Sequence, residues 1–209
     1  MFIKILSFLE RLLSNIQGKG WGSRTVDKEF SAAMRLLSKK EPKICIAIGG
    51  NKGSYSNQIL KKYPNCSIVI FEPSLTNVNI LKKKFGTNTN ICIEGLAVSN
   101  ATGNATLFSD KDGSGLASLT KRRLTHFGID FSKTENVKTI KFEDYWKEKL
   151  DSKSIDIGKI DIESNEMNAL NGFGDSINHI AIIQFECGGC NIDTRNFFQD
   201  FGYFFRERN

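Results

Sequence analysis

Three carboxylates stand at the ends of two predicted strands in the second half of the chain. Asp161 and Glu163 lie at the end of the apolar run Ile157–Ile162, and Glu186 follows the run His179–Phe185. If these strands are neighbours in a parallel sheet, the three side chains meet at one edge of it. A carboxyl group beside like charges has a raised pKa, which suits a general base that removes a proton from a hydroxyl group. The same trio would also suit a divalent cation that lowers the pKa of that hydroxyl, and the sequence does not separate the two mechanisms.

A glycine-rich turn and a further acid indicate a nucleoside-binding site. The turn Gly49–Gly53 follows the apolar strand Lys43–Ile48 and precedes a predicted helix. Glu72 follows the next apolar strand, Ser67–Phe71, where a carboxylate can accept hydrogen bonds from ribose hydroxyls. The turn matches neither the G-x-G-x-x-G pattern of dinucleotide sites nor the G-x-x-x-x-G-K-[ST] pattern of phosphate-binding loops. The expected ligand therefore contains an adenosine-like nucleoside.

Other groups that could do chemistry rank behind these carboxylates. His179 begins a predicted strand and should lie at the opposite end of the sheet, whereas His126 lies in a loop segment that could reach the site. Cys187 and Cys190 form a CxxC pair, but a zinc site would need two further ligands. A metal or redox role for this pair is the weaker interpretation.

Short apolar strands alternate with helices along the chain, which is typical of βαβ units and a mostly parallel sheet. We therefore expect a doubly wound, Rossmann-like α/β fold. The segment Asp112–Ser118, rich in glycine and serine, is expected to form a mobile lid. Helices are predicted at Val26–Ser38, Ser54–Lys62, Leu75–Phe85, Glu143–Leu150, Glu166–Gly172 and Thr194–Phe201. Further strands are predicted within Asn90–Val98 and at Ala105–Phe108, Val137–Phe142 and Tyr203–Arg206.

The N-terminal segment, residues 1–40, is predicted to be a helical extension that precedes a domain at residues 41–209. Its apolar residues recur at helical spacing and form one stripe. Glu10 and Arg11 interrupt the run, which is too short to cross a membrane. The helix is predicted to pack on the domain or on a second subunit in a homodimer, with peripheral membrane contact as the alternative. The stripe comprises Phe2, Ile5, Leu6, Leu9, Leu12, Leu13 and Ile16.

The net charge and the cysteine content limit the expected binding partners and the expected cellular compartment. The net charge of +6 favours anionic partners, but the lysines are spread along the chain. The short runs Lys82–Lys84 and Lys121–Arg123 are interpreted as solvated faces. An odd number of cysteines, five, without a secretory signal predicts a reducing compartment and a cytoplasmic location.

Several segments, taken together, resemble FkbM-type methyltransferases. The resemblance runs from about residue 44 to residue 203 and keeps the family's order of motifs. It implies a fold of the class I methyltransferase type and S-adenosylmethionine as the methyl donor. The matching segments are Ala47–Ser56 for the first motif, Phe71–Pro73 for the second, Leu96–Ser99 for the adenine side, Lys159–Glu166 for the central K-I-D-x-E-G-x-E motif, and Gln184–Glu186 for the strand after it.

The resemblance also implies roles for individual residues. Gly49, Asn51 and Gly53 would hold the methionine end of the cofactor, and Glu72 would hold the ribose. Gly95, Leu96 and Ala97 would border the adenine. Asp161, Glu163 and Glu186 would face the methyl group and the acceptor. The expected cofactor site is completed by Gly50, Ser54, Pro73 and Asp161.

Two positions depart from the family pattern. Ala47 stands where an aspartate is usual, so that cofactor affinity would fall or Asp161 would take over the role of that acid. Ser164 stands where glycine is usual, so that the loop there would follow a different path.

The favoured function is O-methylation of a sugar hydroxyl in a glycan, polysaccharide or glycosylated small molecule. A nucleic-acid methyltransferase is the first alternative, prompted by the net charge but disfavoured because no N-P-P-Y-like motif is present. A binding module that has kept the fold and lost the activity is the second alternative, prompted by Ala47.

Overall fold

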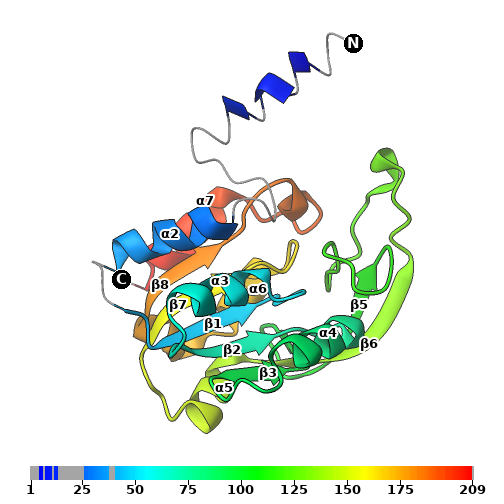
Figure 1. The fold of residues 1–209 in the computed structure, drawn as a ribbon. Helices are drawn as coiled ribbons and strands as arrows, with labels where there is room; N and C mark the ends of the chain where they lie inside the picture. Colours follow the sequence, from blue (N-terminus) through cyan, green and yellow to red (C-terminus); the bar gives the residue numbers. More distant parts are fainter. Residues whose placement is uncertain (1–4, 7, 11, 14–25, 38–40, 209) are drawn as a thin grey trace.

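Five short apolar strands form the central sheet of the protein (Figure 1). The computed structural model describes residues 5–6, 8–10, 12–13, 26–37 and 41–208. The strands all pair in parallel, in the order β3-β2-β1-β7-β8. Because the strand order reverses between β1 and β7, the fold is the expected doubly wound one, with its switch point there. The strands are β1 (Ile44–Ile48), β2 (Ser67–Phe71), β3 (Ile91–Glu94), β7 (Ile155–Ile160) and β8 (Ile180–Phe185).

Helices cover both faces of this sheet, which explains why its inner strands are apolar throughout. On one face Phe30, Ile59 and Leu81 pack against Ile70 and Ile157 of the sheet. On the other face a larger cluster gathers the aromatic rings of Phe71, Phe142, Phe173 and Phe201. The first face is covered by α2 (Val26–Leu36), α3 (Ser54–Lys62) and α4 (Leu75–Phe85), and the second by α5 (Phe142–Lys149), α6 (Glu166–Asn171) and α7 (Phe198–Arg206).

A second, three-stranded sheet stands beside the first and is not part of the parallel core (Figure 1). It contains β4 (Ala97–Val98), β5 (Gly103–Ser109) and β6 (Lys133–Ile140), in the order β4-β6-β5. β5 and β6 are antiparallel, and the segment that joins them, residues 110–132, is a long loop. The strand predicted within Asn90–Val98 is confirmed as β3, and the same segment contains a further strand, β4, which belongs to the second sheet.

The predicted strand at Tyr203–Arg206 is wrong, because these residues belong to helix α7. The aromatic residues there favour strands by propensity, but Phe201 and Phe204 are buried at helical spacing against the core. Tertiary packing of one face of α7 thus decides the local structure.

Helix α2 shares a core with the sheet. Phe30, Ala33 and Met34 are buried in the same cluster as Cys45 of β1 and Ile59 of α3. The apolar stripe predicted in residues 1–16 lies partly outside the described residues. Its described members Ile5, Leu6, Leu9, Leu12 and Leu13 are exposed. Within the described ranges, no helix has the length and hydropathy that a membrane span requires.

Replacing Phe30 by alanine tests whether α2 is integral to the domain. Phe30 is 1% exposed, so Phe30→Ala should lower the free energy of unfolding by about 3 kcal/mol through lost burial and a residual cavity. The control is Leu36→Ala on the same helix, where the side chain is 73% exposed and the change should stay within about 0.5 kcal/mol. Urea unfolding measures both. Equal, small effects would instead support a separable extension at residues 1–40.

Candidate functional site

A cavity of about 680 Å³ opens at the carboxyl edge of the central sheet. Its floor is formed by the ends of β1, β2, β7 and β8, and its roof by residues 114–119 of the β5–β6 loop. Parallel sheets of this kind bind ligands at this edge, next to the switch point. The volume is within the range of sites that hold a cofactor or a drug-sized ligand.

The glycine-rich turn after β1 is shaped by a close approach between two backbone segments. Gly49 has φ +82°, and a Cβ atom placed on it would lie 1.9 Å from the carbonyl oxygen of Asp161. The N–H groups of Gly49 and Gly50 both donate to the carbonyl oxygen of Phe71, each at 3.0 Å. The turn therefore needs a glycine at position 49 because it presses on β7, in addition to any contact with a ligand.

Glu72 joins the end of β2 to this turn. Its carboxylate accepts hydrogen bonds from the backbone N–H groups of Asn51, at 2.6 Å, and Ser74, at 3.0 Å. The side chain is only 5% exposed, and burial raises its pKa while the two N–H groups act in the opposite direction. Glu72 lines the cavity, where its remaining lone pairs can accept hydrogen bonds from a diol.

The three predicted carboxylates come together in the cavity wall. Asp161, Glu163 and Glu186 each offer an oxygen atom, and these atoms all lie within 4.8 Å of one another. Partial burial, together with the hydrogen bond and charge of Asp161, raises the pKa of Glu186 to about 8, although the residue is exposed to solvent. The sequence predicts a carboxyl group of raised pKa in this trio, and Glu186 is the member that would exchange a proton near neutral pH.

Two cations balance this acidic cluster. The guanidinium of Arg122 lies 2.6 Å from Glu163, and the ammonium of Lys159 lies 3.6 Å from Asp161. Burial raises the pKa of Glu163 although Arg122 opposes the change. For Lys159, burial lowers the pKa, but the carboxylates of Asp161 and Glu29 outweigh it, so the net pKa is raised. Glu186 has no such cation within ion-pair distance among the described residues.

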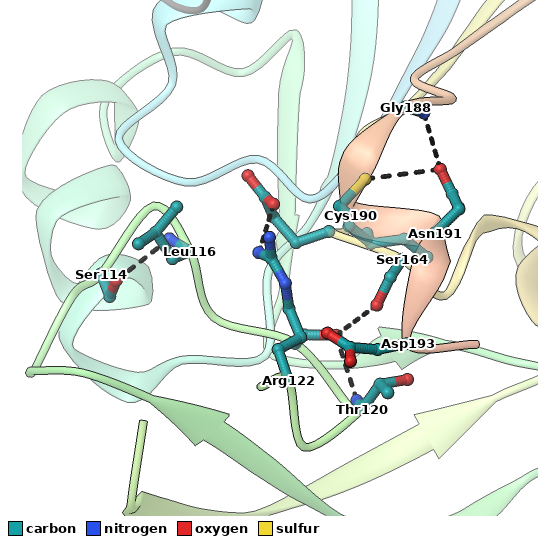
Figure 2. A network of polar contacts seen from close by, with 12 residues as sticks. Ser114, Leu116, Thr120, Arg122, Ser164, Gly188, Cys190, Asn191 and Asp193 are labelled. Atoms are coloured by element: carbon teal, nitrogen blue, oxygen red, sulfur yellow. Dashed lines mark hydrogen bonds and ion pairs between the residues drawn. The ribbon is translucent and has the colours of Figure 1, made fainter. Parts of the chain in front are cut away.

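The β5–β6 loop is fastened to the turn after β7, as Figure 2 shows from close by. Arg122 reaches from the loop to Glu163, and the hydroxyl groups of Ser118 and Ser164 lie 3.4 Å apart. The backbone N–H of Arg123 donates to Asp193, which follows the short 3-10 helix η4 (Gly189–Ile192). The predicted lid segment Asp112–Ser118 therefore forms part of the cavity roof, while its mobility stays a prediction.

The turn that carries Glu163 has a backbone conformation in which glycine is usual. Glu163 has φ +56° and Ser164 has φ +92°. The N–H of Ser164 donates to the carboxylate of Glu166, and the Ser164 side chain is fully buried. Ser164 thus adopts a glycine-like φ, and the polar contacts around the turn offset the strain of that conformation.

Most of the predicted cofactor and catalytic residues line the cavity. They are Gly49, Gly50, Asn51, Ser54, Glu72, Pro73, Leu96, Ala97, Asp161, Glu163 and Glu186. Gly53 and Gly95 lie outside its lining; Gly53 instead begins α3 with φ +74° against Leu81 and Phe85.

The histidines and cysteines do not take part in the lining, with one exception. The ring of His179 packs against that of Trp146 at an interplanar angle of 34°, and His126 is exposed in the 3-10 helix η2 (Thr125–Phe127). Cys187 lines the cavity, whereas Cys190 does not, and both thiols are free.

A second cluster of polar side chains in the cavity wall was not predicted from the sequence. Glu29 of α2, Tyr55 of α3, Lys159 of β7 and Gln184 of β8 all line the cavity. Tyr55, Lys159 and Gln184 lie in segments that resemble family motifs, but the sequence pattern assigns them no role, and no local signal marks Glu29. The interpretation of Lys121–Arg123 as a solvated face is wrong for Arg122, whose side chain is only 9% exposed.

The fold is doubly wound α/β, with a buried acid after β2 and further acids after β7 and β8. The family model described as the methyltransferase FkbM domain matches residues 31–206. The chain therefore belongs to the FkbM methyltransferase domain family.

Comparison with solved structures gives a more distant match. The chain is similar to the crystal structure of the methyltransferase FkbM from Methylobacillus flagellatus KT, with 15% sequence identity and a TM-score of 0.44. The match covers 66% of this chain and 30% of that chain, so this protein spans less than two thirds of its relative's length. No curated protein matches the sequence.

Gly49 should not tolerate a side chain. Gly49→Ala would force β7 away from the turn, and we expect it to lower the free energy of unfolding by about 3 kcal/mol. Gly188→Ala is the matched control, since it has φ −174° and no atom within 4 Å of the added Cβ. Chemical denaturation of both variants gives the comparison. A Gly49→Ala protein as stable as the control would show that the turn does not depend on this close approach.

Proposed function

We propose that the protein is an S-adenosylmethionine-dependent O-methyltransferase that acts on a sugar hydroxyl. The observation that carries the proposal is the juxtaposition of Glu72 and the acid cluster in one cavity. Glu72 supplies the diol-binding carboxylate, and Glu186 supplies a carboxyl group of raised pKa on the opposite side of the switch point. Membership of the FkbM family supports methyl transfer as the reaction.

The residues present fit an adenosyl cofactor. The cavity holds a buried acceptor atom, Oδ1 of Asn51, that has no hydrogen-bond partner among the described residues. Asn51 belongs to the glycine-rich turn, and its backbone N–H donates to Glu72. The ammonium group or the ribose hydroxyls of the cofactor would donate a hydrogen bond to the unpaired Oδ1 of Asn51. Asn51, Ser54 and Glu72 would hold the cofactor, with Leu96 and Ala97 bordering the adenine ring.

In the proposed mechanism, the chain's own residues orient the acceptor and accept its proton. S-adenosylmethionine, when bound, supplies an electrophilic methyl group for in-line displacement. Glu186 removes the proton of the acceptor hydroxyl, while Asp161 and Glu163 orient the sugar by hydrogen bonds. The roof formed by the β5–β6 loop limits access of water. A divalent cation on the same three carboxylates remains the alternative way to activate the hydroxyl, and EDTA treatment distinguishes the two.

The charge of the cavity favours a neutral acceptor over nucleic acid. Among the described residues of the lining, Lys159 is the one basic residue, beside five acidic residues, Glu29, Glu72, Asp161, Glu163 and Glu186. Phosphate groups would be repelled by such a surface, whereas sugar hydroxyls donate to carboxylates readily. Tyr55 adds an aromatic ring to the same wall.

Titration calorimetry with S-adenosylhomocysteine tests the cofactor. The wild type should bind it, and Glu72→Gln should weaken binding at least about tenfold, because a charged acceptor of the ribose hydroxyls is lost. Glu148→Gln, on an exposed part of α5, should bind like the wild type. A folded wild type that does not bind S-adenosylhomocysteine would favour the alternative in which the protein has kept the fold and lost the methyltransferase activity.

Methyl transfer from labelled cofactor tests the acceptor and the base. Neutral sugars should be methylated, and Glu186→Gln should lower kcat about 100-fold or more while S-adenosylhomocysteine affinity changes little. Glu148→Gln again serves as the control. Transfer to RNA or DNA with salt-sensitive binding, and none to any sugar class, would overturn the sugar assignment.

A further inference from the structure

Lys159 is a buried cation that stands beside the acid cluster without belonging to it. Its side chain lies on β7, two residues before Asp161, and the residue is 9% exposed. The ammonium lies 3.0 Å from the carboxylate of Glu29 and 3.6 Å from that of Asp161. It also lies 5.8 Å from the centre of the Tyr55 ring. A buried ammonium is costly unless it is paired, so these contacts fix where it sits.

The register partners of Lys159 on the two neighbouring strands carry no charge. Its register partner on β1 is Ala47 and its register partner on β8 is Gln184. Partners in a parallel pair point to the same face of the sheet, so all three side chains lie on the face covered by α2 and α3. Ala47 carries only a methyl group, and the amide oxygen of Gln184 accepts the hydroxyl hydrogen of Tyr55 at 3.0 Å.

The nearer of the two carboxylates that pair with Lys159 comes from α2, outside the sheet. Glu29 lies 130 residues before Lys159 in the chain, yet their charged groups form a direct ion pair. Phe30, the next residue, is buried in the core, which fixes the position of this helix turn. Glu29 and Val26 both line the cavity, so α2 forms part of the wall on the side of the acid cluster.

We propose that Glu29 is a positioning residue of the methyltransferase site, which anchors the ammonium of Lys159 and thereby keeps the carboxylate of Asp161 available to the cavity. The argument rests on the proposed function, in which Asp161 faces the cofactor and the acceptor. With Glu29 present, the ammonium is shared and stands closer to Glu29 than to Asp161. Without Glu29, Asp161 is the ion-pair partner that remains within 4 Å of the ammonium among the described residues, and the ammonium would close on that carboxylate and neutralise it.

The proposal predicts that an acid at position 47 can replace the acid at position 29, because both positions lie next to Lys159. An acid introduced at Ala47 would project beside Lys159 from the neighbouring strand and could replace the missing charge. The experiment therefore compares the wild type, Glu29→Gln, Ala47→Asp and the double variant Glu29→Gln/Ala47→Asp. Asp27→Asn, an exposed acid in the first turn of the same helix, is the matched control.

Three readouts are measured on the full-length protein: S-adenosylhomocysteine affinity, the division of methyl-transfer effects between kcat and KM, and thermal unfolding without cofactor. Glu29→Gln should weaken affinity or lower kcat about tenfold and lower the unfolding midpoint. Adding Ala47→Asp should restore the affinity and kcat to within about threefold of the wild type and raise the unfolding midpoint again. Asp27→Asn should match the wild type in all three readouts. If Glu29 only stabilised α2, an acid introduced at position 47 on β1 would not restore the activity or stability of Glu29→Gln.

Two outcomes overturn the proposal. In the first, Glu29→Gln behaves like Asp27→Asn. In the second, Glu29→Gln is impaired and Ala47→Asp does not restore it. If Ala47→Asp does not fold, the cycle of Glu29→Gln and Lys159→Gln replaces it, and additive losses would reject the proposal. A wild type that binds no S-adenosylhomocysteine rejects the proposed function instead, and the unfolding midpoints without cofactor still decide whether Glu29 acts through Lys159.

Discussion

The close contact between the turn after β1 and the end of β7 is the constraint on which the rest of the site depends. Gly49 and the carbonyl of Asp161 approach so closely that no side chain fits between them. The N–H of Asp161 donates to the carbonyl of Ile48 and so extends the β1–β7 ladder into the site. The two halves of the cavity, one expected to hold a nucleoside and the other a hydroxyl acceptor, therefore share one fixed backbone junction. Reacting groups held on both sides of such a junction are aligned before they meet, which is the main requirement of an in-line displacement.

Much of the parallel core was predictable because its strands are short, apolar and separated by clear helix patterns. The helices Ser54–Lys62 and Leu75–Phe85 and the strand Ser67–Phe71 have the predicted bounds. The acid cluster was predictable for the same reason, since residues at strand ends converge at one edge of a parallel sheet. Local patterns failed where packing decides the structure, as in the aromatic helix α7. They also did not reveal that the chain leaves one sheet for another between β3 and β4.

The contacts that cross the chain were beyond reach of the sequence. Glu29 meets Lys159, and Arg122 meets Glu163, across separations of 130 and 41 residues. Nothing in the local pattern distinguishes Arg122 from its solvated neighbours, or Glu29 from Asp27. Only the packing of α2 and of the β5–β6 loop brings these groups to the cavity. Ala47, which looked like a lost function in the sequence, lies in the structure next to a lysine that already has a carboxylate partner.

The roof of the cavity and the turn after β7 are joined by direct polar contacts. Arg122 and Ser118 of the β5–β6 loop contact Glu163 and Ser164 of the turn after β7, where two successive residues other than glycine hold positive φ. A substitution on either side leaves a buried polar group on the other without its partner. Residues 118 and 122 are therefore expected to covary with residues 163 and 164 during evolution. Grafting this loop between relatives to exchange acceptor preference would require the turn to be transferred with it.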